Sequence, residues 1–221
     1  MLYLVPTPIG NREDITYRAV RIMGEADLVA CEDTRRTGLL LKHHGIKNKL
    51  ESFHEHNEKR KIPRLMELLR EKKTIALVTD SGMPSISDPG VTLVRACRKE
   101  GIEVSALPGP SAFVTAISGS GFPTHAVSFY GFVPKKQGRR EEFFRSLKDR
   151  QETITCYESP YRIQKTLAII EKHLPGWQVC VCREISKRFE EYAIGTAAEL
   201  QDKIKPKGEF VLVLHSQGMA S

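Results

Sequence analysis

Thr74-Ile75-Ala76-Leu77-Val78 leads directly into Thr79-Asp80-Ser81-Gly82-Met83-Pro84-Ser85-Ile86-Ser87-Asp88-Pro89-Gly90. The first segment is an apolar run typical of a buried strand, and the second is a loop rich in Gly, Pro and Ser. In an open α/β sheet, ligands bind at the carboxyl ends of the strands, where such a loop turns its backbone N–H and C=O groups toward them. A strand over Glu103–Ala106 followed by Leu107-Pro108-Gly109-Pro110-Ser111-Ala112 repeats the pattern. The sequence therefore predicts two ligand-facing loops.

Strand-like runs alternate with helical patterns over the first half of the chain. Strands are expected at Leu2–Val5, Leu28–Cys31, Thr74–Thr79 and Glu103–Ala106, and helices at Ile15–Met23, Thr34–His44, Ile62–Arg70 and Val91–Lys99. Regular alternation of this kind predicts a parallel sheet with helices on both faces.

Turn-forming residues at 119–124 interrupt that alternation and predict a boundary between two α/β domains, 1–118 and 119–221. Strands of the second domain are expected at Val127–Tyr130, Thr153–Tyr157, Gln178–Cys182, Phe189–Ile194 and Phe210–Leu214. Ser159-Pro160 resembles the N-cap and first residue of a helix that places Ile163, Leu167, Ile170 and Leu174 on one face. Crossover helices are fewer than strands here, so this second sheet should be mixed.

Composition points to an ordinary globular protein. Apolar residues make up 40% of the 221-residue chain, and no apolar run approaches the roughly 18 residues of a membrane span. The amino terminus lacks the basic start and long apolar stretch of a signal peptide. A cytoplasmic protein without a membrane partner is expected.

Cysteine and histidine spacing does not indicate a metal site. The five cysteines include no C-x-x-C pair, and Cys180 and Cys182 should share one face of a strand. His54-Glu55-His56 lacks the i,i+4 spacing of a helical zinc pair, and we expect no metal.

The net charge of +7 is concentrated locally. Residues 34–49 include five basic side chains and no acidic one, and residues 131–150 include seven basic against three acidic side chains. Such clusters favour a polyanionic partner, although solvated helix faces laced with ion pairs have the same composition.

Charged residues also follow two of the predicted strands. Glu32-Asp33-Thr34-Arg35-Arg36 supplies two carboxylates and two guanidiniums, of which Asp33 or Thr34 also suits a helix N-cap. Adjacent arginines suit bidentate phosphate contacts. Tyr157-Glu158-Ser159-Pro160-Tyr161-Arg162 ends a strand of the second domain, whereas Lys207-Gly208-Glu209 is typical of a turn. The G-x-G-x-x-G, G-x-x-x-x-G-K-[ST] and G-x-S-x-G motifs are absent, so dinucleotide-binding, P-loop and serine-hydrolase sites are not supported.

These motifs occur in one order along the chain. They are Val5-Pro6-Thr7-Pro8-Ile9-Gly10-Asn11, Asp14-Ile15-Thr16, Glu32-Asp33-Thr34-Arg35, Asp80-Ser81-Gly82-Met83-Pro84, Asp88-Pro89-Gly90, Pro108-Gly109-Pro110-Ser111-Ala112 and Glu158-Ser159-Pro160. The set resembles the small-subunit ribosomal RNA 2′-O-methyltransferase I family, within the tetrapyrrole methylase superfamily, from residue 2 to about 215.

The resemblance implies a two-domain class III methyltransferase, a homodimer that binds S-adenosylmethionine between its domains and methylates a cytidine ribose in the decoding region of 16S ribosomal RNA. It assigns the cofactor to Pro8, Asp80, Ser81, Gly82, Met83, Pro84, Asp88, Ser111, Ala112, Tyr157, Glu158, Gly208 and Glu209. Tetrapyrrole-modifying relatives have a G-x-G-P-G-D type of first loop, which Pro6–Asn11 replaces here. Longer family members continue into a helical segment beyond the last strand, whereas this chain ends at Ser221.

A ribose hydroxyl needs a base to remove its proton. The candidates are Glu32 and Asp33, then Glu158 and His54. Phosphates of the RNA are assigned to Arg35 and Arg36, with Lys135, Lys136, Arg139 and Arg140 extending the positive track.

Three alternative functions remain open. The first is a tetrapyrrole or corrin precursor methyltransferase. The second is Mg²⁺-dependent phosphoryl transfer on Glu32, Asp33, Asp80 and Asp88, and the third is a non-catalytic RNA-binding module.

Overall fold

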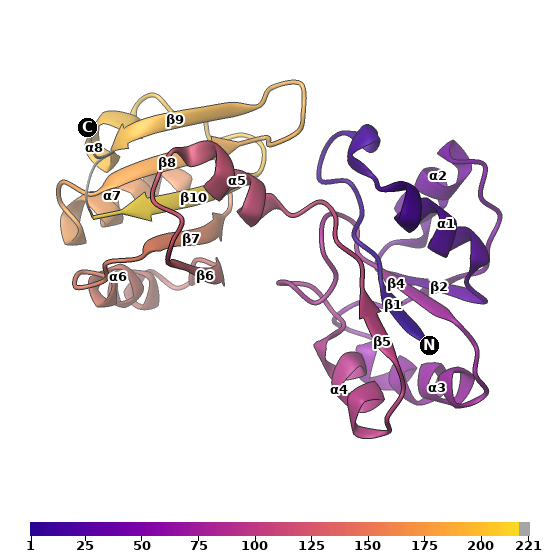
Figure 1. Cartoon of the computed structure of the whole chain (residues 1–221). Helices are drawn as coiled ribbons and strands as arrows, with labels where there is room; N and C mark the ends of the chain where they lie inside the picture. The colour runs from indigo at the N-terminus through magenta and orange to yellow at the C-terminus, as the bar shows by residue number, and fades with distance from the viewer. Residues whose placement is uncertain (217–221) are drawn as a thin grey trace. The chain divides into compact units, whose positions relative to one another are not determined.

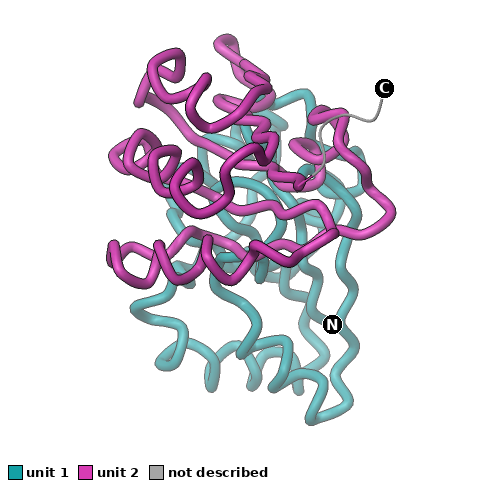
Figure 2. The backbone as a smooth tube through the Cα atoms, turned by 90° about the vertical axis from the view of Figure 1, so that its left-hand side faces the viewer, with its two compact units in different colours: residues 1–111 teal, residues 112–221 magenta. Residues whose placement is uncertain are grey.

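The computed structural model of the chain describes residues 1–216, which form two compact units that divide between Ser111 and Ala112 (Figure 2). The sequence places this boundary later, at the turn formers of 119–124. Helix α5 (Ala112–Ser120) packs on strands of the second unit, which explains why the division precedes this helix. Residues 217–221 of the second predicted domain lie outside the described residues.

Unit 1 is an α/β unit with a five-stranded parallel sheet in the order β3-β2-β4-β1-β5 (Figure 1). Its strands are β1 Leu2–Leu4, β2 Leu28–Cys31, β3 Leu50–Ser52, β4 Ile75–Val78 and β5 Val104–Ala106. Its helices are η1 Arg12–Asp14, α1 Tyr17–Glu25, α2 Thr34–His43, α3 Glu58–Arg70 and α4 Val91–Lys99. The four predicted strands and four predicted helices are confirmed, whereas the edge strand β3 was not predicted.

Helices cover both faces of this sheet, as predicted. Leu65 and Leu93, from α3 and α4, pack with Leu77 in one buried cluster. Ala19 and Leu41, from α1 and α2, belong to a second cluster built on the opposite side chains of the same strands. Successive residues of a strand point to opposite faces, so an apolar run such as β4 fills both cores.

Unit 2 contains a mixed sheet in the order β6-β7-β10-β8-β9, as predicted. Its strands are β6 Val127–Phe132, β7 Thr153–Glu158, β8 Gln178–Arg183, β9 Glu191–Thr196 and β10 Phe210–His215. Only β6 and β7 pair in parallel, and the other pairs are antiparallel. Helices α6 Gln137–Ser146, α7 Ile163–His173 and α8 Ala197–Gln201 complete the unit.

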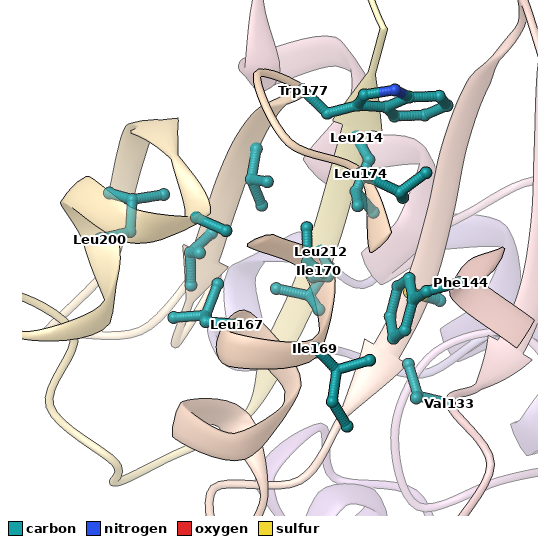
Figure 3. Close-up of a cluster of buried hydrophobic side chains, with 14 of the residues drawn as sticks. Val133, Phe144, Leu167, Ile169, Ile170, Leu174, Trp177, Leu200, Leu212 and Leu214 are labelled. Carbon is teal, nitrogen blue, oxygen red and sulfur yellow. The ribbon is translucent and has the colours of Figure 1, made fainter. Parts of the chain in front are cut away.

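The core of unit 2 lies between the sheet and helices α6 to α8 (Figure 3). Ile163, Leu167, Ile170 and Leu174 are all buried there, which confirms the predicted helical face. Helix α5 packs on the opposite face, where the thiol of Cys182 lies 4.0 Å from the carbonyl oxygen of Ala116. Cys180 lies on the same face, because its sulfur is 3.5 Å from that of Cys182.

The predicted start of α7 is wrong by one turn. The helix begins at Ile163 with Arg162 as its N-cap, not at Ser159-Pro160. Ser159 accepts a hydrogen bond from the backbone N–H of Tyr161 and forms a separate turn ahead of the helix. A serine before proline therefore indicates a turn here, and its side chain does not cap the helix.

Within the described residues no helix is long and apolar enough to cross a membrane. The five cysteines are buried and free.

Candidate active site

The loops that follow β1 and β4 meet at the carboxyl edge of the unit 1 sheet. These strands are neighbours, yet α1 leaves β1 toward one face of the sheet and α4 leaves β4 toward the other. Such a reversal opens a crevice where α/β proteins bind ligands. Thr7 and Gly82 join the two loops through a pair of 3.0 Å backbone hydrogen bonds, and the Thr7 hydroxyl donates to the carbonyl of Thr79 at 2.9 Å.

The loop of residues 79–90 has an unusual backbone. Gly82, Ser85, Ser87 and Gly90 adopt φ angles of 83°, 70°, 64° and 135°. Two of these are serines, for which a left-handed conformation costs energy, and such strain gathers at ligand-binding sites. A Cβ atom on Gly90 would lie 2.8 Å from Leu77 Cδ2, so only glycine fits this position. The predicted ligand-facing loop is thus built from backbone geometry that most residues avoid.

The loop after β5 packs beside the first loop. A Cβ atom on Gly109 would lie 2.5 Å from Cγ of Pro6, so the Gly109 backbone packs against the Pro6 ring as closely as glycine allows. Ser111, at the end of this loop, is half-buried, as is Pro8 in the first loop. The three predicted cofactor segments of unit 1 therefore lie at one edge of its sheet.

Three carboxylates, those of Glu32, Asp80 and Asp88, lie at this edge, and Asp80 alone among them has an ion-pair partner within residues 1–216. The Thr79 hydroxyl donates to Glu32 Oε2 at 3.1 Å, and Asp80 accepts from the backbone N–H of Asp33 at 3.1 Å. Asp80 also pairs with Arg36 at 3.3 Å. Burial and the nearby Glu32 carboxylate raise the pKa of Asp88 to about 6, and burial raises the pKa of Asp80 as well. The cluster thus favours binding of a cation.

The Asp33 carboxylate caps the N-terminus of helix α2. Its carboxylate accepts from the backbone N–H of Arg35 at 2.8 Å and from the Arg35 guanidinium at 3.1 and 2.7 Å. These bonds hold the pKa of Asp33 well below its usual range. The capping interpretation of Asp33 is confirmed. The side chains of Arg35 and Arg36 remain 88% and 70% exposed, so they are accessible to a phosphate.

S-adenosylmethionine fits the charged and polar groups at this edge of the unit 1 sheet. It has a sulfonium and an ammonium group, and Asp80, Asp88 and Glu32 provide the negative charge that attracts them. Backbone groups of the left-handed loop supply further donors and acceptors. Within residues 1–216, neither Asp88 nor Glu32 has an ion-pair partner.

We expect Asp88→Asn to stabilise the protein without cofactor at neutral pH. The folded pKa lies above the ordinary value of 3.8, so wild-type stability is full below about pH 4 and falls as the pH rises to about 6. The variant avoids this loss, and after discounting for solvent screening its gain is about 1 kcal/mol at pH 7.5. Denaturation at pH 4 and pH 7.5 measures this gain in the free energy of unfolding. A gain of equal size at both pH values would contradict the raised pKa of Asp88. The same substitution should lower the affinity for S-adenosylmethionine about tenfold, because it removes one negative charge from the site.

The Glu158 carboxylate of unit 2 is buried and accepts three hydrogen bonds. It accepts hydrogen bonds from the Ser159 backbone N–H at 2.5 Å, from the Arg162 guanidinium at 2.6 Å and from the Thr166 hydroxyl at 2.6 Å. These contacts join the end of β7 to the start of α7. The geometry therefore favours an architectural role for Glu158 over that of a base.

The Gly208-Glu209 segment lies beside this strand end. Gly208 has φ +103°, and a Cβ atom there would lie 2.7 Å from the side chain of Glu184. Glu184 accepts from the Glu209 N–H at 2.9 Å, and Lys187 binds both carboxylates at 3.0 and 2.9 Å. Sequence analysis missed Glu184 and Lys187, because no local pattern pairs either residue with Glu209, more than 20 positions further along the chain.

An aromatic cluster surrounds Tyr157 on the α5 face of the sheet. Its ring contacts Phe129 and Phe132 at centroid distances of 5.0 and 5.3 Å, and Phe113 of α5 stacks on Phe129 at 4.4 Å. The predicted cofactor residue Tyr157 therefore belongs to an apolar wall of unit 2, and Ala112 directly precedes Phe113 of that wall in α5.

Two predicted site residues remain, Arg140 of unit 2 and His54 of unit 1. Arg140 is only 4% exposed, so it does not continue the exposed track of Lys135, Lys136 and Arg139. It is turned inward because α6 packs against unit 2 on that side. His54 follows β3, and its buried Nδ1 has no hydrogen-bond partner in the described part of the chain.

Among residues 1–216, no group of three or more His, Cys, Asp or Glu side chains is arranged to hold a metal ion.

Sequence comparison places this architecture among known proteins. Residues 1–201 match the family model described as Tetrapyrrole (Corrin/Porphyrin) Methylases. Ribosomal RNA small subunit methyltransferase I of Streptococcus pyogenes serotype M3 is 48% identical over 96% of this chain and 75% of its own length. The proteins of that name from Hydrogenobaculum sp. and Thermotoga maritima are each 45% identical, over 98% and 96% of this chain and 96% and 97% of their own lengths.

Solved structures show the same fold at lower identity. Uroporphyrin-III-C-methyltransferase from Thermus thermophilus is 21% identical with a TM-score of 0.67, over 97% of this chain and 94% of that one. A cobalt precorrin-4 methyltransferase is 16% identical with a TM-score of 0.68 over the same shares. The sequence matches extend across both units, and the chain belongs to the ribosomal RNA small subunit methyltransferase I family, within the tetrapyrrole methylases.

Proposed function

We propose that this protein transfers a methyl group from S-adenosylmethionine to the 2′-oxygen of a cytidine ribose in the decoding region of 16S ribosomal RNA. The observation that supports this most strongly is 45–48% identity, across both units, to proteins named for methylation of small-subunit ribosomal RNA. The proposal includes a homodimer that acts in the cytoplasm on the small ribosomal subunit.

The residues of the sheet edge have two tasks in this reaction. S-adenosylmethionine supplies a methyl group already activated by its sulfonium. Asp80, Asp88 and the backbone of residues 81–84 hold the reactants in line and exclude water, which accounts for most of the rate. The second task is removal of the ribose proton as the new bond forms.

Glu32 is the best-placed base among the four candidates. Within residues 1–216 its carboxylate has the Thr79 hydroxyl, at 3.1 Å, as its one hydrogen-bond partner, and it is half-buried after the end of β2. Asp33 is held by Arg35, and Glu158 by Arg162 and Thr166. A carboxylate that already accepts strong hydrogen bonds in its charged form is a weaker base. His54 remains the second candidate, since its Nδ1 is unpartnered within residues 1–216.

Transfer of labelled methyl from S-adenosylmethionine to small ribosomal subunits lacking the modification tests the proposal. Alkaline hydrolysis of the RNA then locates the label, because a 2′-O-methyl group blocks cleavage at its own linkage. We expect label in one alkali-resistant dinucleotide containing cytidine. Label on a base, or transfer to a porphyrin but not to RNA, would refute it. The porphyrin assay matters because the matched family is described by tetrapyrrole methylation.

Arg35→Ala and Arg36→Ala should weaken RNA binding. Each exposed guanidinium that contacts a phosphate releases counterions, so its loss should raise KM for the subunit and reduce the slope of log affinity against log salt by roughly 0.7–0.9. Arg21→Ala is the matched control, because that arginine is 57% exposed on α1 and pairs with Glu25. A salt slope identical to that of the control would leave Arg35 and Arg36 with their observed roles as partners of Asp33 and Asp80.

A further inference from the structure

The three most exposed aromatic side chains in the described part of unit 2 lie at one edge of its sheet. Phe132 ends β6, Tyr161 follows β7 and Phe189 lies between β8 and β9; they are 59%, 92% and 63% exposed. Strands β6, β7 and β8 all run in the same direction, so their carboxyl ends share one edge (Figure 1). Large exposed aromatic rings gathered in this way are typical of a binding surface.

The edge extends across all five strands of the sheet. Paired residues follow one another from β6 to β9 in the order Phe132, Tyr157, Val211, Cys182 and Tyr192. Neighbouring strands are about 4.8 Å apart, so this row spans roughly 19 Å. The surface can therefore contact several units of an extended polymer.

The charge at this edge is positive once its ion pairs are counted. Glu158 pairs with Arg162 at 2.6 Å, and Glu191 pairs with Arg183 at 3.0 Å. Glu184 and Glu209 share Lys187. At this edge five exposed cations have no ion-pair partner among residues 1–216, against one exposed carboxylate, Glu190, that likewise has none; the cations are Lys135, Lys136, Arg188, Lys205 and Lys207. These cations remain available to phosphate groups.

The loop between β8 and β9 is held in a defined shape. Arg183 donates to the carbonyl oxygens of Lys207 and Phe189, at 2.8 and 3.5 Å, which ties the loop to the chain before β10. At its tip the Arg188 guanidinium lies over the Phe189 ring at 5.6 Å. The Phe189 ring is 63% exposed and so remains accessible beside this cation–π contact. An exposed ring next to a guanidinium suits contact with a nucleobase.

We propose that this edge of unit 2, with Phe132, Tyr161 and the Arg188–Phe189 pair, is a platform on which unpaired bases of the RNA substrate stack. The unpaired lysines beside it hold the phosphates. Single-stranded RNA is recognised by this combination of stacking rings and nearby cations. Interleaved lysines distinguish the surface from an apolar interface with a protein, in which charged residues are depleted. The proposal rests on the proposed function and identifies a second contact region for that substrate.

Kinetics with small ribosomal subunits test the platform. We expect Tyr161→Ala and Phe189→Ala each to raise KM for the subunit roughly 5- to 150-fold, the effect of losing one base stack. The value of kcat and the affinity for S-adenosylmethionine should change less than about twofold. Phe189→Trp should restore KM, because it preserves a stacking face. Tyr17→Ala is the matched control, as Tyr17 is 96% exposed on α1 in unit 1. Unchanged KM in both alanine variants, with an active wild type, would overturn the proposal.

Photocrosslinking provides a readout that does not depend on activity. A single-stranded RNA containing 5-iodouridine, irradiated with the wild-type chain, should attach to peptides that contain residue 132, 161 or 189. Attachment only to peptides of unit 1 would overturn the platform. If the wild type methylates no subunit, the proposed function fails, whereas the crosslinks still decide whether this edge binds RNA.

Discussion

Replacement of Glu32 by glutamine is expected to lower turnover on small ribosomal subunits by roughly 10²- to 10³-fold, the usual contribution of a positioned base. Glutamine keeps the shape of the side chain but cannot take up the ribose proton. Its amide can still accept the hydrogen bond that Thr79 donates to Glu32 at 3.1 Å, so the loop after β4 should keep its structure. Affinity for S-adenosylmethionine, measured by calorimetry, should change only a few-fold.

Asp33→Asn is the comparison variant for this prediction. Asp33 pairs with Arg35 and caps α2, and asparagine caps a helix about as well, so this variant should keep its stability and lose less than about tenfold in turnover. Full turnover in the Glu32 variant would remove that residue as the base. In that case His54→Gln becomes the informative substitution, since the buried Nδ1 of His54 has no hydrogen-bond partner in the described residues.

Replacement of Glu158 by alanine should cost about 3–5 kcal/mol of unfolding free energy, the typical result of removing one partner of a buried ion pair. The Glu158 side chain is fully buried, and the substitution leaves Arg162 and Thr166 without their acceptor. Urea denaturation followed by tryptophan fluorescence measures it. The chain has a single tryptophan, and Trp177 belongs to the core of unit 2, so the signal reports this unit.

Two further variants serve as comparisons in this experiment: the conservative substitution Glu158→Gln and the surface substitution Glu142→Ala. Glutamine keeps an acceptor and the volume, so we expect a smaller loss than with alanine. Glu142 is exposed on α6, and its substitution should change stability by less than about 0.5 kcal/mol. A loss below 1 kcal/mol in the alanine variant would show that the carboxylate is not an anchor, and it would return Glu158 to the candidate bases.

The strands were predictable to the extent that they are apolar. β2 and β4 are buried along their whole length and were found from their composition. β3 is a half-buried edge strand of only three residues, Leu50–Ser52, and such a segment has no periodic signal. The short helix α8 was missed although Thr196 and Glu199 form a capping box, a pattern that can be recognised in sequence.

Helix starts were less predictable than helix faces. The apolar face of α7 was predicted correctly, because burial follows the 3.6-residue period. Its start was displaced because Glu158 and Ser159 form a turn ahead of it. Helix α3 begins at Glu58, four positions before the predicted Ile62, since its first turn is polar and Pro63 lies inside the helix.

The sequence by itself determined that the chain has strand ends followed by glycine-rich and acidic loops, because apolar runs and turn formers act over a few neighbouring residues. Only the tertiary structure decided which charged side chains stay free of ion pairs and so remain available to a ligand. Asp80 meets Arg36, and Glu209 meets Lys187, across the fold, whereas Asp88 and Glu32 find no ion-pair partner within residues 1–216. Arg140 is buried for the same reason. Ion pairs and burial depend on which distant segments the topology brings together, and no local pattern records that.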